Sequence, residues 1–168
     1  MAQKDKTLDD LFRETLKDIY YAEKKIATAL GQMAKGAQSS ELRAAFEKHK
    51  RETEEHGRRL EQVFSIIDQP AKGRTCEAID GLLTEGKEFM VDFKGSDALD
   101  AALVAAAQAV EHYEISRYGT LKTWAKELKL TRAAELLERT LDEEKKTDAA
   151  LTKLAESAVN REAREAAE

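Results

Sequence analysis

Hydrophobic residues recur at steps of three and four along most of the chain, which is the period of an amphipathic helix. The first stripe is Leu8, Phe12, Leu16, Ile19, Glu23, Ile26, Leu30 and Met33. Three later stripes have the same period, and they begin near Leu42, Leu103 and Ala133. No segment alternates apolar and polar residues with the period of a half-buried strand. The pattern therefore predicts an all-α fold.

Turn and capping residues divide this pattern into separate helices. Thr7 followed by Asp10 resembles a capping box, and Gly36 to Ser39 ends the first helix. The segment DQPAKGR at 68–74 and the pair Gly95-Ser96 are further breaks. We predict four long helices and one short helix, over residues 7–35, 39–68, 75–92, 97–128 and 131–158. The last residues, from about 159 to 168, read as a polar tail.

Four long helices of about 40 Å each, at 1.5 Å per residue, favour a four-helix bundle. Two short turns predict two antiparallel hairpins. The longer connection between the hairpins carries the short helix, and this arrangement permits the crossover found in ferritin-like bundles.

Each long stripe is apolar at both ends and ionisable in the middle. The ionisable positions are Glu23; His49, Glu52 and His56; Glu111 and Glu114; and Glu144 and Asp148. Their distances from the turns place these positions at corresponding levels of the bundle, if the helical rise is constant. A buried carboxylate is costly unless it is paired, hydrogen-bonded or bound to a metal. Several carboxylates and one or two imidazoles are therefore expected to converge in the bundle's midsection.

The chemistry of these groups points to divalent cations. Two such ions would balance four glutamates, and carboxylate with imidazole suits iron, manganese or zinc. Solvated edge residues are one alternative, and a buried salt-bridge network is another. The network is disfavoured because the stripes offer almost no basic partner, with Arg117 the nearest. The residues alone leave open whether His49 or His56 is a ligand.

Composition narrows the class of protein. The net charge of −5 argues against nucleic acid and anionic membranes as partners. The single cysteine, Cys76, excludes an internal disulfide framework and fits a reducing compartment. The longest apolar run, residues 101–107, is too short to span a bilayer, and the start of the chain shows no signal peptide. These features predict a cytoplasmic protein.

Four segments resemble the ferritin-like bacterial stress proteins of the YciE/YciF family: DIYYAEKKIATAL, AFEKHKRET, DALDAALVAAAQAVEHYEISRYGTL and LLERTLDEEKKTDAALTKLA. The resemblance runs from about Thr7 to Ala158. It implies a ferritin-like antiparallel four-helix bundle, formed by residues 1–168 as one domain, with the extra short helix in the crossover between the second and third long helices. It further implies a dinuclear iron or related metal centre, a homodimer and a link to stress responses.

The resemblance also supplies a set of site residues. Matching positions are Glu23, His49, Glu52, Thr53, Glu111, His112, Glu114, Glu144 and Asp148, of which all except Thr53 and His112 are expected metal ligands. The chain departs from the usual di-iron pattern, which repeats Glu-x-x-His on two helices. It has His49-x-x-Glu52 on the second long helix, and no histidine on the fourth. A centre with few histidines would favour the oxidised form of the metal. It also weakens the assignment of zinc as the bound ion.

Three functions fit these features. The first is a di-iron protein that reacts with dioxygen or peroxide, as an oxidoreductase or peroxidase would. The second is iron storage in a cage, although the sequence has no assembly signature. The third is a non-enzymatic structural or interaction protein whose metal centre stabilises the bundle. The sequence does not separate the first from the third.

Overall fold

The computed structural model describes residues 5–165, and within this range the regular structure is entirely helical. The helices are α1 (Leu8–Gly36), α2 (Ser40–Ile66), α3 (Glu77–Asp92), α4 (Leu99–Glu127), α5 (Thr131–Leu154) and α6 (Asn160–Glu165), with a π-helical turn, Ala155–Val159, between the last two. The all-α prediction is confirmed, and the predicted helix ends lie within a few residues of these bounds.

Local chemistry fixes where the helices begin and how the first hairpin is held. The Thr7 hydroxyl accepts from the Asp10 N–H at 3.3 Å, and the Asp10 carboxylate accepts from the Thr7 N–H at 2.9 Å, so the predicted capping box is confirmed. The Ser39 hydroxyl caps α2 by accepting from Leu42 N–H. In the turn before α2, the backbone N–H groups of Gln38 and Ser39 donate to the Asp100 carboxylate at 2.8 and 2.7 Å. This contact ties the first hairpin to the start of α4.

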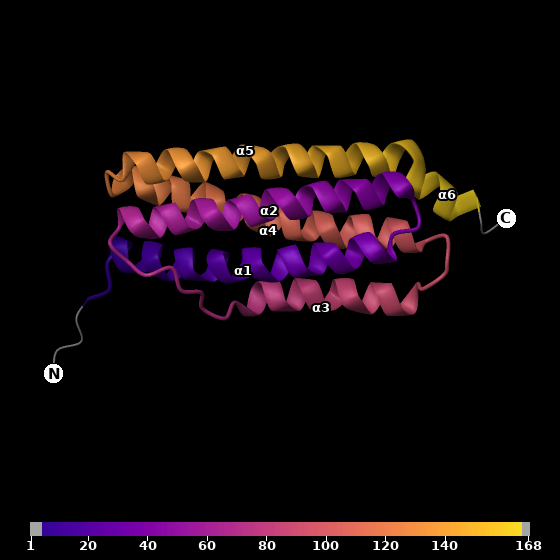
Figure 1. Ribbon diagram of the computed structural model, residues 1–168, viewed down its shortest axis with the longest axis horizontal. Helices are drawn as coiled ribbons and strands as arrows, with labels where there is room; N and C mark the ends of the chain where they lie inside the picture. The colour runs from indigo at the N-terminus through magenta and orange to yellow at the C-terminus, as the bar shows by residue number, and fades with distance from the viewer. Residues whose placement is uncertain (1–4, 166–168) are drawn as a thin grey trace.

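The four long helices pack side by side, with each antiparallel to its neighbours (Figure 1). Helix α1 packs on α2 and α4, and α5 packs on α4 and α2. Helix α3 lies outside this group against α1 and α4. The connection before α3 follows the surface of α1, where Arg74 N–H donates to the Lys17 carbonyl oxygen at 3.2 Å. The chain therefore changes sides between its two hairpins, and α3 is part of that crossing.

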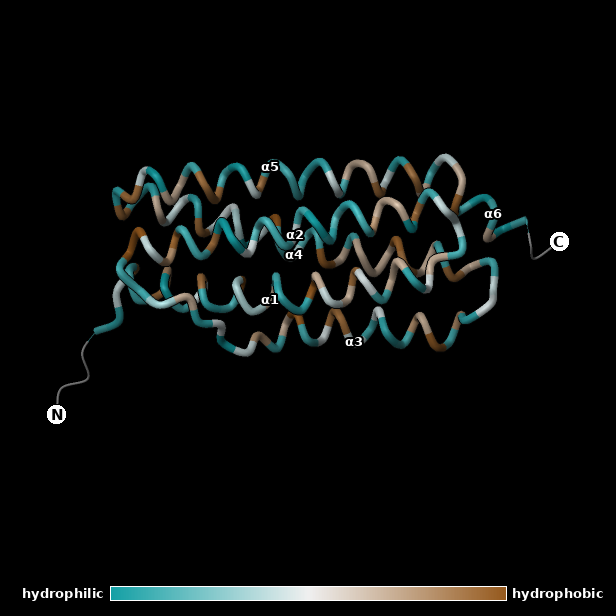
Figure 2. The backbone as a smooth tube through the Cα atoms, viewed as in Figure 1, coloured by the Kyte–Doolittle hydropathy of each residue, from teal (hydrophilic) through white to brown (hydrophobic). Residues whose placement is uncertain are grey.

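Hydrophobic and hydrophilic residues are interspersed along every helix, as amphipathic packing requires (Figure 2). The buried hydrophobic residues form one cluster drawn from all five main helices. Its largest fully buried members include Tyr118, Phe12, Phe46, Phe64 and Ile79. The polar C-terminal tail predicted for residues 159–168 begins with a buried residue, Val159, whereas the residues of α6 are not buried. Within the described residues, no helix has both the length and the hydropathy needed to cross a membrane.

Candidate metal centre

Six ionisable side chains are buried in the midsection of the bundle. All four long helices contribute to this buried cluster, which consists of Glu23 from α1, His49 and His56 from α2, Glu111 and Glu114 from α4, and Glu144 from α5. None of the six is more than 4% exposed. Because these groups are withdrawn from solvent, they need partners inside the protein.

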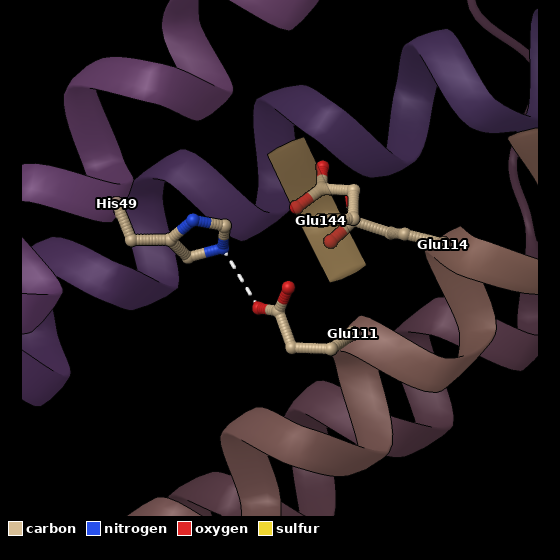
Figure 3. A group of neighbouring side chains, drawn as sticks. All are labelled: His49, Glu111, Glu114 and Glu144. Carbon is tan, nitrogen blue, oxygen red and sulfur yellow. Dashed lines mark ion pairs between the residues drawn. The ribbon is translucent and has the colours of Figure 1, made fainter. Parts of the chain in front are cut away.

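The first group within this cluster joins three helices. His49, Glu111, Glu114 and Glu144 each offer a ligand atom, and these atoms lie within 4.8 Å of one another. Figure 3 shows the four side chains turned toward a common space, with Nε2 of His49 2.8 Å from Oε1 of Glu111. One imidazole with three carboxylates is a ligand set that suits iron or manganese.

The second group lies between α1, α2 and α5. Glu23, His56 and Glu144 offer ligand atoms within the same 4.8 Å limit. Nδ1 of His56 lies 2.8 Å from Oε1 of Glu144 and 3.8 Å from Oε1 of Glu23. The Tyr118 hydroxyl, which is completely buried, donates to Oε1 of Glu23 and orients it. Glu144 belongs to both groups.

Many polar atoms of the cluster have no hydrogen-bond partner within the described residues. They are Oε2 of Glu23, both ring nitrogens of His49, Nδ1 of His56, Oε2 of Glu111, and both carboxylate oxygens of Glu114 and of Glu144. Buried polar atoms without partners are rare in native proteins, and each costs about 1–3 kcal/mol. Nε2 of His49 and Nδ1 of His56 each have an ion-pair contact with a carboxylate at 2.8 Å, but the other unpartnered oxygens converge on a space that could hold metal ions.

Burial and mutual repulsion change the acidities of these groups. Burial raises the pKa of Glu23 to about 8, although His56 opposes the rise. Burial likewise raises the pKa of Glu111 to about 7 against the influence of His49. The pKa of Glu114 rises well above its ordinary value because of burial and the nearby charges of Glu144 and Glu23. Without cations, the protein relieves the repulsion by holding protons.

His56 and Glu144 behave in the opposite way, as a charged pair. Burial opposes the imidazolium of His56, but the adjacent Glu144 and the charge of Glu23 outweigh it and raise the pKa of His56 to about 9. Burial also opposes the charge of Glu144, but His56 lowers the pKa of Glu144 below its ordinary value. His56 is held from its other side, where Nε2 lies 2.9 Å from Oε2 of Glu143.

A basic residue that the sequence stripes did not suggest lies behind His56. Arg59 is 3% exposed, and its Nη1 donates to Oε2 of Glu143 at 2.9 Å and to the Thr140 hydroxyl at 2.7 Å. The guanidinium therefore neutralises Glu143, and Glu143 orients the His56 ring. Among the described residues, the salt bridge of Arg59 goes to Glu143 and not to a carboxylate of the cluster.

The structure brings together five of the seven ligands predicted from the sequence. Glu52 lies outside the cluster with its side chain 32% exposed, 3.1 Å from Nζ of Lys48. Asp148 is 23% exposed and contacts Nε2 of His112 at 3.2 Å and the Gln108 amide at 3.1 Å. His112 itself is exposed, with 70% of its side chain accessible.

His56, which the sequence left in competition with His49, lies in the cluster together with it. A signal for this was present in the spacing. At about 100° per residue, positions seven apart differ by roughly 20° around a helix, whereas positions three apart differ by roughly 60°. His56 therefore shares the inward face of His49 more closely than Glu52 does. The Arg59–Glu143 pair had no comparable signal, because both residues lie among many charged neighbours.

Comparison with known proteins identifies the relatives of this chain. The family model DUF892, a domain of unknown function, matches residues 7–164. Protein YciF of Escherichia coli strain K12 is 43% identical over 159 residues, which cover 94% of this chain and 96% of YciF. The crystal structure of this E. coli stress protein superposes with a TM-score of 0.88 at 43% identity, covering 93% of this chain and 99% of that one.

Two further structures are similar. YcfI of Rhodopseudomonas palustris, described as a proposed structural protein, has a TM-score of 0.86 and 42% identity, over 90% of this chain and 97% of its own. A protein of Xanthomonas campestris pv. campestris shares the fold at 20% identity, with a TM-score of 0.70 over 91% of this chain and 94% of that one. The family match and the extent of the identity to YciF together establish that the chain belongs to the YciE/YciF family.

Proposed function

We propose that the chain is a ferritin-like di-metal protein whose bundle binds two iron ions and lets them react with dioxygen or peroxide. One observation carries the proposal: carboxylates and imidazoles from four helices meet in a buried space, and many of their polar atoms have no partner among the described residues. The ferritin-like arrangement of the helices is part of this proposal. The antiparallel packing of the long helices and the crossing through α3 support it.

The two groups divide the ligands between two ions. His49, Glu111 and Glu114 would hold one ion, Glu23 and His56 would hold the other, and Glu144 would serve both. Carboxylate and imidazole ligation supports iron, with manganese or zinc as alternatives. Bound iron would supply one electron from each ion to the oxidant. That Glu52 and Asp148 also bind metal stays a prediction, and their exposure and surface contacts do not favour it.

The protein's own side chains would orient the ligands and handle protons. The Glu143 carboxylate holds Nε2 of His56, so Nδ1 faces the cluster, and the Tyr118 hydroxyl holds Glu23. Metal binding requires carboxylates without protons and neutral imidazoles. Loading would therefore release protons from Glu23, Glu111 and Glu114, whose pKa values are raised, and from His56.

A non-enzymatic structural role is the alternative, and the description of the R. palustris relative as a proposed structural protein favours it. In that case metal would stabilise the bundle without turnover. A stress-related role is supported by the description of E. coli YciF as a stress protein. The homodimer and the cytoplasmic location stay predictions. Sedimentation equilibrium would check the dimer and would also test the storage-cage alternative.

The decisive experiment is metal analysis of the protein as isolated, with anomalous scattering to locate the ions. We expect two ions per chain, one beside each imidazole of the cluster. Aerobic addition of iron(II) to metal-free protein should then oxidise iron faster than buffer does. Glu144→Gln should lose both properties, whereas Glu135→Gln, an exposed change on the same helix, should keep them. A wild-type protein that takes up no metal would refute the proposal, and metal uptake without turnover would favour the structural alternative.

A further inference from the structure

A cavity of about 170 Å³ lies between α2 and α5, beside the buried cluster. Its walls are mainly apolar or small side chains: Ala45, Phe46, Thr147, Ala150, Leu151 and Leu154. Phe46, Leu151 and Leu154 are themselves buried, whereas Ala150 is exposed. The cavity therefore extends from the surface between the two helices into the apolar layer that flanks the cluster.

His49 connects this cavity to the candidate metal centre. Its side chain lines the cavity, and its Nε2 lies 2.8 Å from Oε1 of Glu111 in the first group. Only 4% of the residue is exposed, and its Nδ1 has no hydrogen-bond partner among the described residues. One imidazole ring thus separates the cavity from the carboxylates. A molecule in the cavity would lie against a proposed ligand of the first ion.

The charges around the cavity disfavour ions as occupants. Four charged residues contribute to its wall, and two of them are carboxylates that already have partners. Glu52 lies 3.1 Å from Lys48, and Glu143 lies 2.9 Å from the Arg59 guanidinium. A cation entering here would also pass the exposed Lys146. Any ion would exchange its hydration for an apolar lining, which is costly without a free counter-charge.

The size and lining instead suit a small uncharged molecule. A closed apolar cavity of about 150 Å³ admits xenon or benzene, and the part of this cavity walled by Phe46, Leu151 and Leu154 has a similar lining. Of the two oxidants considered above, dioxygen is apolar, whereas hydrogen peroxide must give up hydrogen bonds to water to enter such a space. The apolar part of the lining therefore favours dioxygen.

We propose that the cavity between α2 and α5 is the entry and holding site through which dioxygen reaches the candidate metal centre past His49. This inference rests on the proposed function, and it assigns dioxygen as the oxidant and α2–α5 as its route. It also gives the lining a role in specificity, because the same apolar surface that admits dioxygen disfavours polar molecules.

Xenon tests the cavity in metal-free protein, independently of any turnover. Crystals under xenon pressure should show one xenon atom between Phe46 and Leu151. Ala45→Leu and Ala150→Leu add side-chain volume at the wall and should remove it. Ala44→Leu and Ala149→Leu, exposed neighbours on the same helices that do not line the cavity, are the matched controls and should keep it. No xenon in the wild-type cavity would overturn the inference.

Oxidation kinetics then test the route. Each variant that has lost xenon is loaded with iron(II) without oxygen and mixed with dioxygen or with hydrogen peroxide. We expect oxidation by dioxygen to slow by about tenfold or more, equivalent to about 1.4 kcal/mol of added barrier. Oxidation by peroxide should change less than about twofold, and the control variants should match the wild type.

The outcomes separate this inference from the proposed function. A wild-type protein that binds no iron(II) would refute the proposed function, and the xenon result would still show whether the cavity takes an apolar molecule. If the Ala45→Leu and Ala150→Leu variants lose xenon, bind iron(II) and still react with dioxygen at the wild-type rate, the inference about the cavity is overturned and the proposed function is not. Equal slowing with both oxidants would overturn the selection for dioxygen.

Discussion

Replacing Glu114 by Gln exchanges one oxygen for an NH₂ group on a side chain that is 0% exposed. Both carboxylate oxygens lack a hydrogen-bond partner among the described residues. Burial and the charges of Glu144, Glu23 and Glu111 raise the pKa of Glu114 well above its ordinary value of 4.5. In metal-free protein, Glu114 therefore keeps its proton to a higher pH than it does in the unfolded chain.

The cost of this proton can be worked out by linkage. An acid whose folded pKa is raised contributes full stability below its unfolded pKa, and this contribution is lost as pH rises toward the folded value. Between the unfolded and the folded pKa the loss grows by about 1.4 kcal/mol per pH unit, so it is larger at pH 7 than at pH 5. Gln cannot ionise, so Glu114→Gln removes the cost. We expect the variant to stabilise metal-free protein at pH 7, by about 1.4 kcal/mol for each pH unit by which the folded pKa of Glu114 is raised within that range.

Added metal should offset the stabilising effect of Glu114→Gln. A ligand that binds only the folded state stabilises it by about 2.7 kcal/mol at one hundred times its dissociation constant. Gln lacks the negative charge that balances the ion, so the variant should gain less from added manganese(II) than the wild type. The free energy of unfolding is measured in urea with and without manganese(II), at pH 5 and pH 7. These measurements give the effect of Glu114→Gln on metal-free protein and its effect on the stabilisation by metal. Glu127→Gln, an exposed change of equal charge on α4, is the control.

One result would refute this reasoning. If Glu114→Gln destabilised metal-free protein by more than about 1 kcal/mol at pH 7, Glu114 would be an ionised partner in a salt-bridge network. The cluster would then be stable without cations, and the case for a metal centre would lose its main support.

Further predictions concern the surface carboxylates, the acidity of the cluster and the first helix. Glu52→Gln and Asp148→Asn variants should still contain two ions per chain when their metal content is measured, because neither side chain reaches the buried groups. Loss of an ion in either variant would show that the replaced residue is a metal ligand. The melting temperature of metal-free protein should fall as pH rises from 5 to 8. The pKa values of Glu23 and Glu111 are raised to about 8 and about 7 in the folded protein, so the unfolded chain loses these protons first and folding becomes less favourable. A melting temperature that does not change with pH would contradict this. Thr7→Ala should lower the free energy of unfolding by about 1 kcal/mol through loss of the cap, and an unchanged value would show that the first turn does not depend on it.

The helical period in the sequence was enough to place most of the inward side chains. Glu23, Glu111, Glu114 and Glu144 lie on apolar stripes, and each is at most 1% exposed. The capping box at Thr7 and the turns between the helices were also readable, because they depend on residues close together in the chain. Local chemistry and a fixed angle per residue suffice for such features.

The sequence did not predict which side chains on the stripe of α2 point inward. Glu52 lies between His49 and His56 in the sequence, yet it turns toward Lys48 at the surface while both histidines turn inward. A stripe taken in steps of three and four is broad enough to include both an inward and an edge position. How far each helix is rotated about its own axis decides between them, and packing against the neighbouring helices sets that rotation.

The sequence by itself determined that the chain is helical, where the helices begin, and that ionisable groups interrupt their apolar stripes at corresponding heights. Only the tertiary structure decided that Glu144 is shared between two groups, that Glu143 and Arg59 hold His56, and that a cavity lies between α2 and α5. The physical reason is that the helical period fixes side-chain directions around one axis. The relative rotation, shift and spacing of separate helices follow from how their side chains pack.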